Sequence, residues 1–222
     1  LWNMVDTTAF SVYQKDDRPI LKGLLIELDG DYLNVVGTNS FIFAMRRQPR
    51  FSNEAVSAVI PARTLKDCMR ILGDDENADI RLVINKNSCF IISENTKIYT
   101  RLLEGEFIKY ANIIPKEYTT RVRVNTQLLE RSLNMISVLS REDDTNPVKI
   151  SVSGEELELE SKSDYGDGRD MIGCSSEGDP MKMSFNARYL LEILKAIDDE
   201  EIFIEFISSM RPMVIKPVEG DD

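Results

Sequence analysis

The chain contains one local pattern twice, and this repeat constrains its fold more than any other feature. In the second half, Asn186 can cap a helix whose apolar residues recur every three to four positions up to Ile197. In the first half, Pro61 to Leu72 places alanine, basic residues and leucine in the same order, at one constant spacing from the second copy. The sequence therefore predicts two related domains in series.

A hairpin is repeated as well. Asp29 and Gly30, a pair typical of hairpin turns, separate strands predicted at 21–28 and 32–38. Gly154 stands in the same place between strands predicted at 150–152 and 157–159. Further strands are predicted at 41–47, 55–60, 79–84, 88–93, 97–103, 170–174, 181–185, 201–207 and 213–216.

Each copy thus reads as a helix, several strands, a second helix and further strands, which indicates tandem α+β domains. The opening helices are predicted at 1–12 and 127–139. Pro115 ends the first copy, so we expect domains at 1–117 and 118–222. The chain begins within a helix and stops where another strand would follow, and we expect both ends to be truncated.

Composition limits the chemistry. Among 222 residues there is no histidine and the net charge is −11, which disfavours metal and acid–base catalysis and, at first sight, nucleic-acid binding. The three cysteines are far apart, which argues against a disulfide framework or a metal site. No apolar run approaches the roughly 20 residues of a membrane span. We expect a soluble cytoplasmic protein without cofactor, metal or catalytic residues.

Two acidic motifs favour ordinary structural roles. Residues 164–170 suggest a calcium loop, but the twelfth position, which needs a glutamate, is Ser175, so we predict a solvated hairpin loop. The pairs at 16–17 and 143–144 are predicted to lie in turns.

The repeated helices are locally basic. The helix at 61–72 carries Arg63, Lys66 and Arg70 against one aspartate, and that at 186–197 carries Arg188 and Lys195 against one glutamate. A solvated helix face explains this pattern, and so does a phosphate-binding surface, because screening over about 10 Å lets a basic surface act locally on an acidic protein.

Three segments resemble one family. Residues 102–115 resemble the signature (L)-(I/V)-(D/E)-G-x-(F/Y)-P-x-Y-x-x-(V/I)-(I/L)-P of the bacterial replicative sliding clamp, the beta subunit of DNA polymerase III. Residues 185–190 resemble its F-N-x-x-Y-(L/V) motif, and 138–140 its (I/V)-L-S. The resemblance covers the whole chain as the family's second and third domains. It implies the DNA-clamp fold, in which two helices of each domain pack on antiparallel β-sheets.

The resemblance also implies a function without chemistry. Two three-domain subunits of the family close into a homodimer ring around duplex DNA and keep the replicative polymerase on it, with helices meeting phosphates without base readout. The matching subunit-interface residues are Val138 and Leu139, which we expect to be exposed here. The candidate DNA-facing residues are Lys15, Arg18, Arg63, Lys66, Arg70, Arg131, Arg188 and Lys195.

The family docks linear peptides of polymerase III, clamp loader subunits and repair polymerases in a pocket between its second and third domains. The matching residues are Leu21, Thr38, Phe41, Phe43, Ile113, Asn186, Tyr189, Met210 and Met213. The usual histidine and arginine are here Phe41 and Ile42, the proline of the signature is Ile108 and a common arginine is Asn112, so we expect a more apolar pocket. Two alternatives remain: an interaction scaffold of the same fold without DNA function, and a nuclease, for which the sequence supplies no carboxylate cluster.

Overall fold

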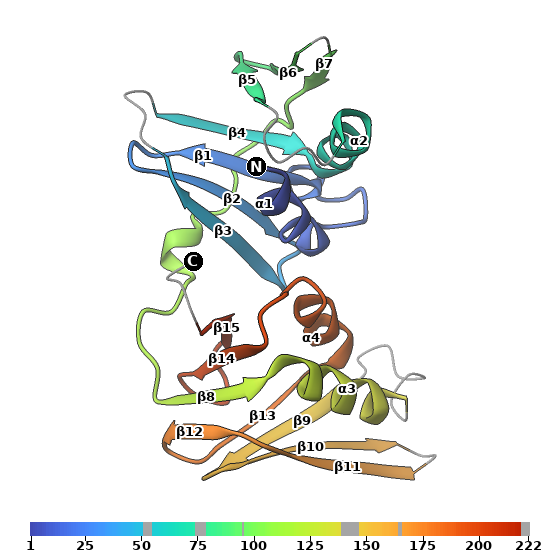
Figure 1. Cartoon of the computed structure of the whole chain (residues 1–222), viewed down its shortest axis with the longest axis vertical. Helices are drawn as coiled ribbons and strands as arrows, with labels where there is room; N and C mark the ends of the chain where they lie inside the picture. The colour runs from blue at the N-terminus through green and yellow to red at the C-terminus, as the bar shows by residue number, and fades with distance from the viewer. Residues whose placement is uncertain (51–54, 74–78, 95, 139–146, 164–165, 219–222) are drawn as a thin grey trace. The chain divides into compact units, whose positions relative to one another are not determined.

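The computed structural model describes residues 1–50, 55–73, 79–94, 96–138, 147–163 and 166–218. The chain forms two compact units, residues 1–108 and 109–221, hereafter unit 1 and unit 2. Figure 1 shows that both are built from helices packed on antiparallel sheets. The α+β architecture predicted from the sequence is confirmed.

Unit 1 pairs two helices with two sheets. Its sheets have the strand orders β3-β2-β1-β4 and β5-β6-β7. Helices α1 and α2 contact each other, and α2 also contacts strands of both sheets. The elements are α1 (Trp2–Asp6), the 3-10 turns η1 (Ala9–Ser11) and η2 (Pro19–Lys22), β1 (Gly23–Leu28), β2 (Tyr32–Thr38), β3 (Phe43–Pro49), β4 (Val56–Pro61), α2 (Ala62–Leu72), β5 (Arg81–Ile84), β6 (Ser88–Ser93) and β7 (Thr96–Arg101).

Unit 2 repeats this plan. Its sheets have the orders β11-β10-β9-β13 and β12-β8-β14-β15, and α3 packs against α4. The elements are η3 (Tyr110–Asn112), β8 (Thr120–Asn125), α3 (Thr126–Ser137), β9 (Pro147–Ser153), β10 (Glu156–Ser163), β11 (Gly166–Gly173), β12 (Ser175–Gly178), β13 (Met181–Asn186), α4 (Ala187–Leu194), β14 (Glu201–Phe206) and β15 (Val214–Pro217).

The sequence repeat is a structural repeat. In each unit a hairpin forms the middle of one sheet, β1 with β2 and β9 with β10. The strand that leads into the second helix, β4 or β13, pairs with the first strand of that hairpin. The second helix follows at once in both units, so the predicted duplication is confirmed.

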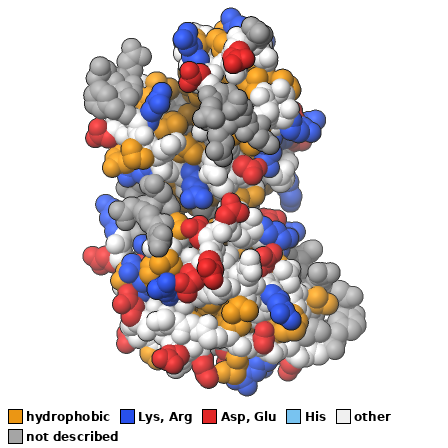
Figure 2. Space-filling model, in the orientation of Figure 1, with side chains coloured by type: hydrophobic (Ala, Val, Ile, Leu, Met, Phe, Trp, Pro, Cys, Tyr) orange, Lys and Arg blue, Asp and Glu red, His pale blue; other side chains and the backbone are white. Residues whose placement is uncertain are grey.

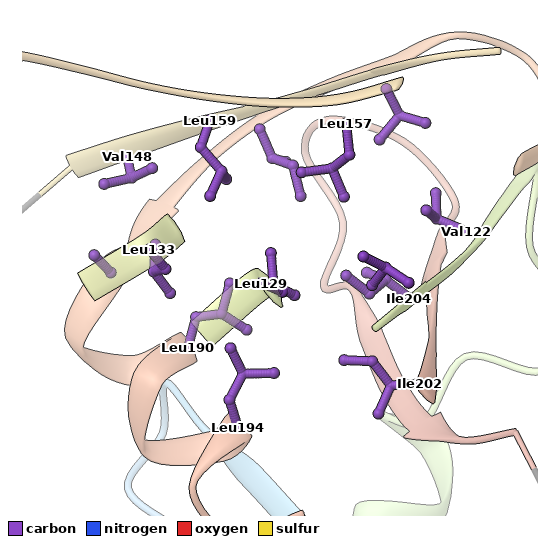
Figure 3. Packing of buried hydrophobic residues seen from close by; sticks show 14 of the residues in the cluster. Val122, Leu129, Leu133, Val148, Leu157, Leu159, Leu190, Leu194, Ile202 and Ile204 are labelled. Carbon is purple, nitrogen blue, oxygen red and sulfur yellow. The ribbon is translucent and has the colours of Figure 1, made fainter. Parts of the chain in front are cut away.

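Each unit has its own apolar core. In unit 2, Leu129 and Leu133 of α3 and Leu190 of α4 point toward Leu157 and Leu159 of β10, all fully buried (Figure 3). The core of unit 1 is formed in the same way by Val5, Leu24, Ile26, Ile60, Leu65, Cys68, Cys89 and Ile91, among others. Burial of such side chains contributes about 1.5–3 kcal/mol each, and it fixes which face of every helix remains for water.

Some sequence predictions were wrong in detail. The opening helix ends at Asp6 instead of continuing to residue 12, because the hydroxyl groups of Thr7 and Thr8 donate hydrogen bonds back to the carbonyl oxygens of Asn3 and Met4 at 2.7 and 2.6 Å. Residues 166–170 belong to strand β11 and not to a loop. Such a polar strand is tolerated because β11 is the edge of its sheet and pairs only with β10.

Two strands, β8 and β12, were not predicted. Strand β8 alternates buried Val122 and Val124 with Arg121 and Arg123, a period-2 signal that was present in the sequence. None of the helices in the described parts of the chain is long and apolar enough to span a bilayer.

Gly37 of β2 is a packing constraint that generates a test. A Cβ atom there would lie 2.5 Å from Ser11 Oγ and 2.9 Å from the carbonyl oxygen of Thr8. We therefore expect Gly37→Ala to lower the free energy of unfolding by about 1–3 kcal/mol, measured by urea denaturation. Gly173→Ala is the matched control, because nothing lies within 4 Å of its Cβ position. A Gly37→Ala protein as stable as this control would contradict the packing described here.

Candidate nucleic-acid and peptide contact surfaces

Helix α2 presents a basic face. Ala62, Leu65 and Cys68 are buried on one side, and Arg63, Lys66 and Arg70 lie off that side and are exposed. The side chain of Arg63 is 95% exposed. Figure 2 shows basic side chains projecting from the position of α2. The face therefore offers mobile cations to an external anion.

A single carboxylate organises this face. Asp67 lies between Arg63, whose Nε atom is 4.0 Å from Asp67 Oδ2, and Arg70, which also forms an ion pair with Asp67. Exposed pairs of this kind contribute at most about 1 kcal/mol. One carboxylate shared by two arginines also cannot cancel the charge of both. With Lys66 the face keeps a net charge of +2.

The basic candidates of unit 2 are spread over two helices and are less clustered than those of α2. Arg131 is exposed on α3, opposite buried Leu129 and Leu133. Arg188 is exposed in the first turn of α4, with its guanidinium carbon 5.5 Å from the centre of the Tyr189 ring. Lys195 follows the last residue of α4, where a cation is favoured by the helix dipole.

Lys195 has acidic neighbours. A groove of about 560 Å³ lies between the start of α3 and the end of α4. Its lining residues are Asn125, Thr126, Gln127, Glu130, Leu194, Lys195, Ile197, Asp198, Asp199 and Glu200. Figure 2 likewise shows many acidic side chains on the viewed face of unit 2. Lys195 is therefore a weaker phosphate contact than the cations of α2.

Lys15 and Arg18 lie outside the helices, between η1 and η2. Both are exposed. The guanidinium of Arg18 donates a hydrogen bond from Nη1 to Ser40 Oγ at 2.9 Å and lies 5.8 Å from the Tyr13 ring centre. Arg18 thus braces the β2–β3 turn, a role that the sequence did not reveal.

The β2–β3 turn exposes an aromatic ring. Thr38 Oγ1 donates to the carbonyl oxygen of Ile42 at 2.7 Å, and Asn39 Oδ1 accepts hydrogen bonds from the backbone N–H groups of Phe41 and Ile42 at 2.9 and 2.8 Å. Ser40 completes the turn at a φ of 78°. As a result Ile42 is buried and Phe41 is 77% exposed. An exposed phenylalanine on a well-bonded turn is a feature suited to apolar contact.

The other candidate residues of unit 1 are less exposed. Leu21 is buried in η2, and its carbonyl oxygen accepts a hydrogen bond from the Tyr13 N–H at 2.9 Å. Phe43, the first residue of β3, is partly buried. Leu21 and Thr38 therefore hold the shape of this part of unit 1, whereas the side chain of Phe41 is exposed.

In unit 2, Asn186 positions the candidate Tyr189. The Asn186 side chain caps α4 by accepting a hydrogen bond from the Arg188 N–H at 2.9 Å. Tyr189 follows in the first turn and is partly buried. Met213 packs on the core of the unit, whereas Met210 is 91% exposed.

The nine candidate pocket residues thus divide between the two units: Leu21, Thr38, Phe41 and Phe43 belong to unit 1, and Ile113, Asn186, Tyr189, Met210 and Met213 to unit 2. Ile113, just after η3, is exposed. Of the two interface candidates, Val138 at the end of α3 is exposed as predicted, and Leu139 lies outside the described residues.

The cysteines are poor nucleophiles. Cys68 and Cys89 are buried in the core of unit 1, and burial raises the pKa of the Cys89 thiol to about 11. Burial is also the main cause of the raised pKa of Cys68 and Cys174. No group of three or more Cys, Asp or Glu side chains that could hold a metal ion occurs in the described parts of the chain.

These two consecutive α+β units, each with paired helices on antiparallel sheets, define the DNA-clamp class of fold. Residues 1–109 match the central domain, and residues 111–222 the C-terminal domain, of the DNA polymerase III beta subunit. The chain belongs to this family, the beta sliding clamps.

Individual relatives agree with this assignment. A beta sliding clamp of Staphylococcus epidermidis is 30% identical over 224 residues, which cover all of this chain and 59% of the relative. The sliding clamp of Bacillus subtilis superposes with a TM-score of 0.93 at 28% identity, over 99% of this chain and 59% of that one. The beta subunit of Streptococcus pyogenes superposes with a TM-score of 0.94 at 26% identity, over 100% of this chain and 60% of that one. The chain therefore spans about three fifths of the length of these relatives.

The buried thiol of Cys89 predicts an alkaline loss of stability. Its pKa in the folded protein, about 11, lies above the ordinary value of 9.0. The unfolded chain therefore loses this proton first, and stability present below pH 9 falls as the pH rises toward 11, by up to about 1.4 kcal/mol per pH unit. Urea denaturation at several pH values measures the change. Because lysines and tyrosines also titrate there, the control is Cys89→Ala, which we expect to show a shallower loss; equal slopes would contradict the assignment.

Proposed function

We propose that this chain is the central and C-terminal part of a sliding clamp, a non-catalytic processivity factor that keeps a replicative DNA polymerase on its template. The observation that carries the proposal is the exposed basic face of α2, which is locally positive although the chain has a net charge of −11. It stands on a family match that covers both units in order. The domain limits of 1–117 and 118–222 and a cytoplasmic location belong to the same proposal.

The proposed mechanism requires contact with DNA phosphates without recognition of the base sequence. Arg63, Lys66 and Arg70 reach phosphates through long exposed side chains, which provide attraction but no base readout. Arg131, Arg188 and Lys195 add weaker contacts from unit 2. Loose contacts of this kind allow the duplex to slide, and closure of a homodimer ring, with Val138 and Leu139 at the subunit interface, keeps it from leaving.

The second part of the function is peptide docking. We propose that polymerase III, clamp loader subunits and repair polymerases bind through short apolar peptide segments. Phe41 and Met210 supply exposed apolar surface, and Tyr189 a partly buried ring beside a capped helix start. Large exposed apolar side chains on rigid supports are typical anchors for such peptides.

An interaction scaffold of the same fold without DNA function is the second candidate. The acidic groove around Lys195 and the acidic net charge favour it, because they oppose phosphate binding by unit 2. The basic face of α2 favours the clamp.

Retention on DNA separates the two candidates. We expect the full-length protein that contains this chain, once loaded on nicked circular DNA, to remain bound through gel filtration and to be released when the DNA is linearised. The triple variant Arg63→Ala, Lys66→Ala, Arg70→Ala should be retained less, and its retention should depend less steeply on salt, since each lost phosphate contact reduces the salt slope by about 0.9.

The matched control for retention is Arg50→Ala, Lys182→Ala, Arg211→Ala, which removes the same charge from exposed residues outside the helices. It should behave as the parent protein does. Retention that is unaffected by linearisation would contradict the clamp, and no retention at all would favour the scaffold.

Peptide docking is tested on this chain directly. Fluorescence anisotropy with a labelled peptide of the family's Q-L-x-L-F type should give a saturable curve that a scrambled peptide does not. Tyr189→Ala should weaken binding about thirtyfold or more, as truncation of an interface anchor does. Tyr99→Ala, an exposed tyrosine of β7, is the control and should bind normally. A folded Tyr189→Ala protein with parental affinity for the peptide would contradict the peptide-docking part of the proposal.

A further inference from the structure

The small sheet of unit 1 has an unusual outward face. Strands β5, β6 and β7 are antiparallel, and their register places Val83 opposite Phe90 and Phe90 opposite Tyr99. Residues directly paired across strands project from the same side of a sheet. The other side carries Cys89 and Ile91, which are fully buried in the core of unit 1. The Val83–Phe90–Tyr99 row therefore faces away from the core.

Basic residues border this row on the same side. Because side chains alternate along a strand, residues two positions away share its face. Arg81 and Lys97 lie two positions before Val83 and Tyr99, and Arg101 lies two positions after Tyr99. We call this surface the β5–β7 face; its residues are Arg81, Val83, Phe90, Ile92, Lys97, Tyr99 and Arg101.

The aromatic centre of the β5–β7 face is accessible and ordered. The rings of Phe90 and Tyr99 have centroids 5.2 Å apart and an interplanar angle of 56°. Lys97 Nζ lies 4.3 Å from the Phe90 ring centre. Tyr99 is nevertheless 56% exposed and Val83 37% exposed. A flat ligand can therefore reach a ring that its neighbours already hold in place.

The cations of this face lack acidic partners among the described residues. No described carboxylate forms an ion pair with Arg81, Lys97 or Arg101. The face thus combines three cations with exposed aromatic surface, in a protein that is acidic as a whole.

The corresponding sheet of unit 2 shows the opposite arrangement. There Arg121 Nη2 lies 2.6 Å and Lys216 Nζ 2.9 Å from Glu205 Oε1, and Arg123 is paired with Glu201. Both glutamates are on β14, which follows the second helix of unit 2 as β5 follows that of unit 1. Strand β5 begins with Arg81 where β14 begins with Glu201. The same fold therefore neutralises one face and leaves the other basic.

We propose that the β5–β7 face binds single-stranded nucleic acid, with Arg81, Lys97 and Arg101 contacting phosphates and Tyr99 and Phe90 stacking on bases. Proteins that hold single strands combine a basic surface with exposed aromatic rings, because every base has a face that can stack. A duplex hides its bases and would use the cations alone. The inference goes beyond the proposed function, which assigns duplex contact to helices and not to this sheet.

The test is an anisotropy titration of the 222-residue chain with a fluorescein-labelled oligothymidylate at low ionic strength. We expect saturable binding. The logarithm of the association constant should fall with the logarithm of the salt concentration at a slope of about −2, as for three phosphate contacts by a single strand. Tyr99→Ala should weaken binding by about five- to a hundredfold, as loss of one stacking ring does. A duplex of equal length should bind Tyr99→Ala and the parent equally.

A charge-matched pair of variants makes the test specific. Arg81→Ala, Lys97→Ala, Arg101→Ala should abolish saturable binding of the oligothymidylate, whereas Arg50→Ala, Lys182→Ala, Arg211→Ala, which removes three exposed cations elsewhere, should leave it unchanged. Equal losses in both triple variants, or parental affinity in Tyr99→Ala, would overturn the proposal. Binding of an acidic apolar peptide but not of the oligothymidylate would overturn it as well and indicate a protein partner. Failure of the clamp proposal would instead appear in the α2 variant on circular DNA.

Discussion

Each helix of this protein can bury only one face, and the rest of the structure depends on that constraint. In α2 the buried residues Ala62, Leu65 and Cys68 commit one side to the core of unit 1. Arg63, Lys66 and Arg70, which lie off that side, then face water. The same packing of α3 on α4 fixes the orientation of Arg131 and Arg188. The apolar core thus determines which faces of the helices and sheets can display charge.

Charge is distributed locally on an acidic protein. In unit 2, Glu201 and Glu205 neutralise the cations of one sheet, and Asp198 to Glu200 lie beside Lys195. In unit 1, Asp67 brings Arg63 and Arg70 together without cancelling them, and the β5–β7 face has no described counterion. Since screening acts over about 10 Å at ordinary salt, a polyanion responds to these local surfaces more than to the net charge. The net charge alone is therefore a poor guide to nucleic-acid binding.

The sequence predicted those parts of the fold that depend on local periodicity. Strands β2 and β6 begin and end where alternation placed them, and α2 starts one residue after its predicted start. The opening helix was predicted too long because side-chain hydroxyl groups at Thr7 and Thr8 compete for its carbonyl oxygens. Of the site, exposure of the helix cations followed from periodicity. The brace between Arg18 and Ser40 and the cation–aromatic β5–β7 face did not, since they join residues that are distant in sequence or depend on strand register.

The central proposal is that the exposed cations of α2 and α4 contact duplex DNA. Electron cryomicroscopy of the full-length protein loaded on a primed circular duplex tests this most directly. The account predicts a closed ring with Arg63, Lys66, Arg70 and Arg188 nearest to the duplex phosphates. A duplex bound against the sheets, or protein bound to DNA without ring closure, would contradict it.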